Sequence, residues 1–372
     1  MTASAPACRT TSGVAVEIEE LSGEKALTEF VQFYDRVYES RPIRWTAMQA
    51  LELPMLMGTS PFAEGRTIRP LVGRDGGQIV ARCAAAVDQR YLDHWGDDVG
   101  HIALFEALPG TRDATRQLMD EACGWLASQG MTAARCGFGL GEFPFAIDSY
   151  DDLPPNLVRQ NPAYYHALLK DAGFESEKGW VDYKIAVTPE LVERWQRALD
   201  GAAAQGFDIV PLRDVPKDTL VGQFVDTWNV AFDRHWGAAP FTEAEFSLLL
   251  DVLGPLGMLD LSVLAYDGDA PVGVLWVNPE MTAMAVASAG REVRDDERLN
   301  TLGIGVLPAA RGKGVNLAMA SYAYLQLAGQ GYTHVSYTLV LDDNWPSRRT
   351  GERLGGFVCA NYMVYRRNLR GR

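Results

Sequence analysis

The stretch 302–316, LGIGVLPAARGKGVN, constrains this chain more than any other. It reads as an apolar strand, a proline break and a basic, glycine-rich turn that opens a helix, because apolar residues recur at helical spacing as far as Leu325. The first amide groups of a helix have no partner within it, and the helix dipole is positive at that end. Arg311 and Lys313 add fixed positive charge. The turn therefore predicts a binding site for a phosphate or pyrophosphate group.

The glycine spacing in this turn differs from two common nucleotide-binding loops. No Gly-Lys-Ser/Thr closes it, and it is not G-x-G-x-x-G. It resembles the acetyl-CoA loop of the GNAT superfamily of N-acetyltransferases, whose pattern is Gln/Arg-x-x-Gly-x-Gly/Ala. Arg311 fills the first position and Gly314 the fourth, whereas Asn316 stands where the family has Gly or Ala. The apolar strand that ends at Val306, just before the loop, agrees with the family's order of elements.

A second segment, DDNWPSRRTGERLGGF at 342–357, resembles the GNAT element Asn-x-x-Ala/Ser-x-x-Leu-Tyr-Glu-Lys-Leu-Gly-Phe. The resemblance implies that Asn344 and the helix after it hold the pantetheine arm and the adenosine phosphates of the cofactor, to which arginines are suited. Gly351 replaces a tyrosine that in many members protonates the departing thiolate, and Tyr337 and Tyr362 are candidate substitutes. The matching residues are Asn344, Ser347, Glu352, Leu354, Gly355 and Phe357.

The resemblance implies a binding site for acetyl-CoA, or for another acyl-CoA, and no metal. For catalysis it points to His235, in the loop that forms one wall of the acceptor pocket in GNAT folds, and to Tyr337. No Glu or Asp occurs in 299–306, where many members place the base, so His235, a water chain, Asp342 or Asp343 stay open as alternatives. The expected cofactor residues are Ile304, Gly305, Val306, Arg311, Gly312, Lys313, Gly314, Val315, Asn316, Asn344, Ser347 and Arg348.

The first half of the chain predicts the same order of elements without the loop. Strands are expected at 14–19, 67–72, 78–83, 102–106 and 131–138, with helices at 25–38 and 113–129. The loop EALPGTRDATRQ lacks the GNAT pattern, and its Glu106 and Asp113 would repel a pyrophosphate. Tyr164 and Tyr165 open a short helix, where they line a pocket or pack in the core.

The expected fold is α/β, with two tandem GNAT-like domains that each hold a twisted, mostly antiparallel mixed sheet flanked by helices. The segments are a flexible tail at 1–12, an N-terminal GNAT-like domain at 13–188 that lacks the CoA loop, a helical linker at 189–206, and a C-terminal GNAT domain at 207–372 with the acyl-CoA site. The last strand, 361–367, is expected to close the sheet of the C-terminal domain.

Composition narrows the choice of partners. The chain has 372 residues and a net charge of −14, with 34 Lys and Arg against 48 Asp and Glu. This charge disfavours nucleic-acid binding and suits a cationic amine. The five cysteines are scattered, no apolar run approaches the roughly 20 residues that span a bilayer, and the N-terminus lacks an apolar signal segment. A cytoplasmic protein with no membrane partner, either a monomer or a homodimer, is expected.

These observations lead to an expected function with two alternatives. The first is an acyl-CoA-dependent N-acyltransferase that transfers its acyl group directly to a small-molecule amine. The second is a non-catalytic acyl-CoA-binding or scaffold protein, which Gly351 and the missing carboxylate favour. The third is an aminoacyl-tRNA-dependent transferase, because such enzymes also pair two GNAT-like domains, but the −14 charge and the CoA-type loop argue against it.

Overall fold

The computed structural model describes residues 16–41, 47–155 and 161–369. Most predicted helices and strands are confirmed, with ends that move by a few residues. The first half contains β1 (Glu17–Glu20), α1 (Glu24–Tyr38), α2 (Gln49–Leu56), β2 (Arg66–Asp75), β3 (Gln78–Asp88), α3 (Gln89–Trp95), β4 (Val99–Ala107), α4 (Arg112–Ser128), β5 (Ala133–Cys136), β6 (Phe145–Ala146), α5 (Tyr165–Asp171) and β7 (Glu175–Ala186). The predicted tail at 1–12 lies outside the described residues.

The second half also alternates helices and strands. It contains α6 (Pro189–Ala203), β8 (Phe207–Pro211), α7 (Lys217–Phe232), α8 (Glu243–Leu253), α9 (Met258–Leu261), β9 (Val263–Asp267), β10 (Ala270–Asn278), α10 (Met281–Ser288), β11 (Thr301–Val306), α11 (Val315–Gly329), β12 (His334–Leu341), α12 (Trp345–Arg353) and β13 (Phe357–Asn368). Thr242 caps α8 and forms the predicted capping box with Glu245.

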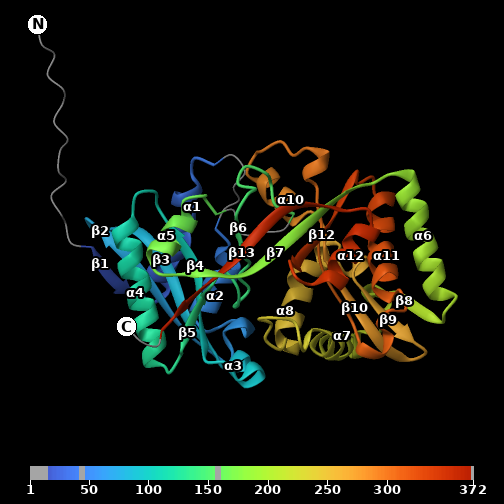
Figure 1. The fold of residues 1–372 in the computed structure, drawn as a ribbon, viewed down its shortest axis with the longest axis horizontal. Helices are drawn as coiled ribbons and strands as arrows, with labels where there is room; N and C mark the ends of the chain where they lie inside the picture. The colour runs from blue at the N-terminus through green and yellow to red at the C-terminus, as the bar shows by residue number, and fades with distance from the viewer. Residues whose placement is uncertain (1–15, 42–46, 156–160, 370–372) are drawn as a thin grey trace, which may run out of the picture.

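Two sheets organise the molecule. One has the order β1-β2-β3-β4-β5-β13-β7-β12, with β6 beside β13, and the other is the antiparallel sheet β11-β10-β9-β8. In Figure 1 the long arrows of β7 and β13 run from one half of the molecule into the other. Residues 365–368 of β13 pair with β5, while the beginning of β13 pairs with the end of β7. The two halves therefore share one continuous sheet.

The prediction for the last strand is wrong in one respect. Instead of closing a sheet of its own half, β13 lies in the interior of the larger sheet, between β5 and β7. Strand β7 was not predicted. It carries Trp180, Asp182 and Lys184 on one face and Val181, Tyr183 and Ile185 on the other. These two strands give each half a strand from the other half's sequence.

The buried cores show the same exchange. Tyr365 of β13 belongs to the core of the first half, where it packs against Phe145. Val181 and Tyr183 of β7 belong to the core of the second half. The predicted linker forms α6 as expected, but its Trp195 is fully buried against Tyr324 of α11, so this helix is part of the second core.

Polar contacts also join the halves. The buried Glu245 of α8 accepts hydrogen bonds from Arg90 at 2.7 Å and Arg66 at 3.2 Å, both from the first half. Trp95 of α3 donates to the carbonyl of Ala238 at 2.7 Å. Because these partners are largely desolvated, the contacts fix the orientation of one half against the other. None of the helices in the described part of the chain has the length and apolar character needed to cross a membrane.

Candidate functional site

The site begins where β11 and β12 separate. Within the described residues β11 forms a ladder only with β10, and β12 only with β7. Side chains bridge the two strands at one end: Asn300 exchanges hydrogen bonds with the backbone of Ser336, and the amide of Leu302 donates to Oγ1 of Thr338 at 3.0 Å. Beyond Leu302 no bridge is present between the described residues of the two strands. The strands therefore leave an open split between the two sheets.

The direction of the backbone N–H groups in β11 shows which of them face the split. Successive N–H groups of a strand point to opposite edges. The amide of Leu302 points to β12, while the amide of Leu307 points to the carbonyl of Val272 in β10. By this alternation the amides of Ile304 and Val306 face the split. An extended ligand arm with amide groups can pair with such an edge as an added strand would.

Two glycines of β11 set the distance to α7. A Cβ on Gly303 would come within 2.6 Å of the indole of Trp228, and a Cβ on Gly305 within 2.6 Å of Ala231. Both contacts are far below van der Waals distance, so only glycine permits α7 to pack this closely on β11. Gly305 was predicted as a cofactor residue, and the structure gives it a packing role beside the split.

The basic loop follows directly from β11. Gly314 has φ of +83° and is the N-cap of α11, and Gly312 has φ of +78°, so both take the left-handed backbone that favours glycine. The Cβ positions of both open to unfilled space. Arg311 donates to the carbonyl of Val306 at 2.9 Å. The loop is exposed and presents the first amides of a 15-residue helix, which is the geometry expected for an anion site.

Asn316, the departure from the family pattern, joins the two helices that border the split. Its side chain donates to Oγ1 of Thr350 in α12 at 2.8 Å. Asn344 is the N-cap of α12 and accepts from the amide of Ser347. Arg348 donates to the Tyr183 hydroxyl at 3.1 Å and to the carbonyl of Asp342. The predicted residues of the loop and of α12 thus lie at neighbouring helix N-termini.

Gly351 lies under two tyrosine rings. A Cβ at this position would be 3.2 Å from Tyr337 and 3.2 Å from Tyr183, so the rings fill the place of the missing family side chain. The Tyr337 hydroxyl bonds Oγ of Ser347 at 2.8 Å. Burial raises the pKa of Tyr337 to about 12, so its proton is present at neutral pH. Tyr337 therefore remains a candidate proton donor beside α12.

His235 lies on the opposite face of the sheet. It is half-buried in the loop after α7, with its ring against Trp180 and Phe232. Burial lowers the pKa of His235 to about 4, so the ring is neutral at pH 7. The two other predicted bases are less suited, because Asp343 is exposed and paired with Lys178 at 2.5 Å. Asp342 packs against the backbone of Gly179.

The corresponding place in the first half is filled by its own side chains. At the end of β4 the N–H group of Ala107 donates to the hydroxyl of Tyr165 at 2.8 Å, and the carbonyl of Ala107 accepts from the hydroxyl of Tyr164 at 2.7 Å. The buried Glu106 accepts from Tyr165 at 2.7 Å. These contacts give the tyrosine pair a packing role at the end of β4. The absence of a cofactor site in the first half stays a prediction.

One acidic residue of the site was missed. Asp182 of β7 is fully buried, accepts from the amide of Leu339 at 2.5 Å and from the Tyr362 hydroxyl at 2.8 Å. Leu339 sits at a bulge of β12 with φ of +53°, a backbone conformation that costs a leucine roughly 1 kcal/mol or more. The alternation of β7 predicts a strand, but nothing in the residues next to Asp182 marks it as a buried acid.

Two curated proteins are similar in sequence. Protein YghO of Escherichia coli is 25% identical over 252 residues, which cover 66% of this chain and 63% of that protein. The bacterial ceramide synthase of Caulobacter vibrioides is 23% identical over 335 residues, which cover 84% of this chain and 86% of that protein. The chain thus spans less than two thirds of YghO. No family model matches the chain.

Solved structures match over nearly the whole chain. A tandem GNAT protein from the clavulanic acid biosynthesis pathway superposes with a TM-score of 0.56 and 12% identity, over 96% of this chain and 100% of that protein. A glucosamine N-acetyltransferase region of a fungal β-N-acetylglucosaminidase gives a TM-score of 0.58 and 14% identity, over 96% of this chain and 38% of that protein. Because the sequence identity is this low, the similarity to these structures is a similarity of fold. The chain therefore has the tandem fold of the GCN5-related N-acetyltransferases, with two such units that exchange strands.

Proposed function

We propose that this chain is an acyl-CoA-dependent N-acyltransferase whose acyl-CoA binds in the split between β11 and β12. The observation that carries the proposal is the open edge of β11, where the amides of Ile304 and Val306 face a space that leads to the N-terminus of α11. A pantetheine arm would pair with this edge, and the pyrophosphate would meet the amides of the loop with Arg311 and Lys313 nearby. A fold shared with N-acetyltransferases supports this reading.

The chemistry would be direct transfer. A strand amide at the split polarises the thioester carbonyl, a neutral amine attacks the carbonyl carbon, and the C–S bond breaks to release the thiolate. Tyr337 would give the thiolate its proton, with Ser347 orienting the hydroxyl. Most of the rate would come from positioning, because a thiolate is a fair leaving group.

One observation favours a particular substrate class as a second candidate. The relative that matches along most of both chains is a bacterial ceramide synthase, and ceramide is the N-acyl derivative of a long-chain amine. The donor and acceptor screen should therefore include a long-chain acyl-CoA and a long-chain amino alcohol beside acetyl-CoA and short amines.

Replacing Gly314 by Glu is expected to weaken acetyl-CoA binding by about 30-fold, close to 2 kcal/mol, because a carboxylate would face the pyrophosphate. Calorimetric titration of the pure protein measures the change. Gly331→Glu is the matched control: Gly331 follows the other end of α11, has φ of +88° and also opens to unfilled space, so strain and charge are the same. Equal binding in both variants would place the cofactor elsewhere.

The same titration separates the alternatives. Binding without release of free thiol in the presence of any amine tested would favour the non-catalytic acyl-CoA-binding protein. No binding of either acyl-CoA would exclude the acyl-CoA site and leave a different donor, such as an aminoacyl-tRNA.

Replacing Tyr337 by Phe is expected to lower kcat by at least about tenfold while the affinity for acyl-CoA stays within twofold, because only the proton for the leaving thiolate is lost. Thiol release measures kcat. Tyr324→Phe is the control, since it removes another buried hydroxyl of the same core, one bonded to the carbonyl of Ser336. An unchanged kcat in Tyr337→Phe would remove Tyr337 from the mechanism.

A further inference from the structure

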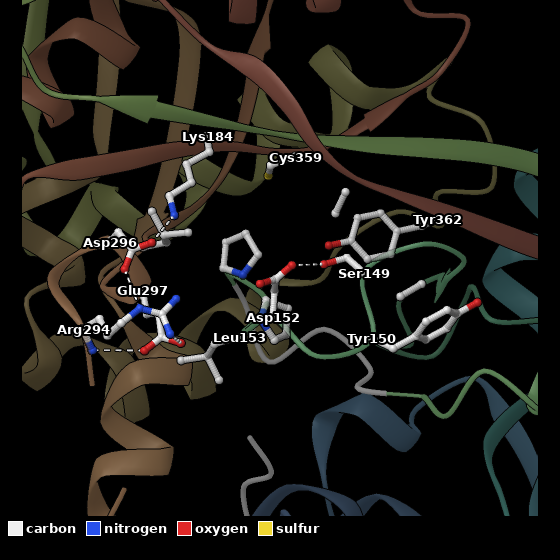
Figure 2. A pocket seen from close by; sticks show the side chains of 15 residues that line it. Ser149, Tyr150, Asp152, Leu153, Lys184, Arg294, Asp296, Glu297, Cys359 and Tyr362 are labelled. Carbon is white, nitrogen blue, oxygen red and sulfur yellow. Dashed lines mark hydrogen bonds and ion pairs between the residues drawn. The ribbon is translucent and has the colours of Figure 1, made fainter. Parts of the chain in front are cut away.

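A cavity of about 90 Å³ lies between the two halves. Figure 2 shows it bordered by Ser149 and Asp152 from the first half, by Arg294 and Asp296 from the second, and by Tyr362 of β13. It also reaches Leu299, which leads into β11 through Asn300. The cavity thus adjoins both the exchanged strands and the start of the split.

Among the described residues of its wall, one carboxylate, that of Asp152, makes no ion pair. Asp296 is neutralised by Lys184 at 2.9 Å and by Arg294 at 3.0 Å, and these bonds lower the pKa of Asp296 to about 2. Asp152 instead accepts a hydrogen bond from Oγ of Ser149 at 2.9 Å and makes no ion pair within the described residues. A wall of this kind suits a small cation such as a protonated amine.

Tyr362 connects this cavity to the buried acid. Its ring lines the cavity, and its hydroxyl donates to Oδ2 of Asp182 at 2.8 Å. Oδ1 of Asp182 accepts from the amide of Leu339, the residue after Thr338. Since Thr338 makes the last bridge before the split opens, Asp182 bonds both a side chain of the cavity wall and the backbone of β12 at the start of the split.

The geometry points to the cavity as the binding site of the acceptor amine, with Asp152 holding the ammonium group and Tyr362 and Asp182 forming the route by which it loses a proton. This inference rests on the proposed acyltransferase function and adds to it the acceptor site and the proton acceptor. On this assignment no carboxylate is needed as a base in 299–306, because Asp182 of the exchanged strand β7 supplies it.

The ammonium group gives a proton to the Tyr362 oxygen while the Tyr362 hydroxyl gives its own proton to Asp182. The neutral amine attacks the thioester, the C–S bond breaks, and the second amine proton leaves as the amide forms. That second proton replaces the one that Tyr337 gives to the thiolate, so the products are amide, thiol, a neutral Tyr337 and a protonated Asp182 that later releases its proton to water.

The surroundings of Asp182 fit a proton acceptor. Burial raises the pKa of Asp182 to about 6, and the bonds from Leu339 and Tyr362 limit the rise. Among the described residues, the titratable groups that face it are Tyr362 and Cys359, both of β13. Burial and the nearby Asp182 charge raise the pKa of Cys359 to about 12, and they also raise the pKa of Tyr362 well above its usual range. On the same face the buried indole N–H of Trp180 has no partner within the described residues, so a polar ligand atom or water suits it.

Three variants of the full chain test the assignment, measured with the acyl-CoA and amine found to release thiol. Asp182→Asn keeps the acceptor oxygen for Leu339 and is expected to lower kcat at least 100-fold. It should also abolish the rise of kcat with pH near 6. Tyr362→Phe should lower kcat as well. Asp152→Asn should raise KM for the amine about tenfold with kcat within twofold.

Glu106→Gln is the matched control. Glu106 is also a buried carboxylate that accepts from a tyrosine hydroxyl, but it lies in the first half, so kcat and KM should stay within twofold. Unchanged kcat and pH profile in Asp182→Asn would overturn the proton route, and unchanged KM in Asp152→Asn would overturn the acceptor site. In all variants acyl-CoA affinity should stay within twofold. If the wild-type chain binds no acyl-CoA and releases no thiol, the proposed function itself fails and this inference falls with it.

Discussion

Removing residues 357–372 is expected to leave neither half of the chain folded. The deletion takes away β13, which pairs with β5 on one side and β7 on the other in the interior of the larger sheet. It also removes Tyr365 from the first core and Tyr362 and Val364 from the cluster between the halves. Two independent domains would respond differently, because the first half would keep its own core intact.

Hydrogen exchange and thermal unfolding measure this effect. Protection should be lost together in β2–β4 of the first half and β8–β10 of the second. The control deletion of residues 370–372 keeps every described strand pair and should unfold like the full chain. Tyr365→Ala is a milder version, expected to cost about 3–5 kcal/mol from the lost packing of a buried aromatic ring. Persistent protection in β2–β4 after the large deletion would show that the first half is stable alone.

The fold could be predicted from the sequence as far as local patterns reach. The helix pattern of 25–38, the Asp-Gly-Gly turn of the first hairpin and the capping box at Thr242 depend on neighbouring residues, and the structure confirms them. The exchange of β7 and β13 depends on pairing between residues more than a hundred positions apart. Strand order of this kind is decided by long-range packing, which an alternating pattern does not specify.

The candidate site likewise has a part that local sequence predicts and a part that depends on long-range contacts. Arg311, Gly312, Lys313 and Gly314 are contiguous, so their composition alone predicted a basic loop at a helix N-terminus, and the structure has that geometry. Asp182 has no such neighbours. It becomes a buried acid only because β13 returns to place Tyr362 over it and β12 bulges to direct an amide at it. A lone Asp in a strand carries no sign of this in the sequence.

Replacing Asp182 by Asn is expected to stabilise the folded chain by roughly 3 kcal/mol at pH 7. The pKa of Asp182 is raised from 3.8 to about 6 in the folded state, so the folded chain binds this proton more tightly than the unfolded chain. The carboxyl therefore costs little below about pH 4. Its cost grows as the pH rises through the window from about 4 to 6 and is complete above it, when the buried group is ionised. The Asn side chain keeps an oxygen for the Leu339 amide and never carries the charge.

The difference in unfolding free energy between Asp182→Asn and wild type, measured with urea from pH 4.5 to 8, checks this expectation, since all other titrating groups cancel in it. It should be small at the acid end and grow to its full value by pH 7. A variant less stable than wild type at every pH would mean that Asp182 serves only to cap the bulge at Leu339. Greater stability together with a loss of turnover would mean that Asp182 has a functional role. Functional sites retain buried charges that destabilise the fold when the reaction requires them, whereas a purely structural site has no reason to do so.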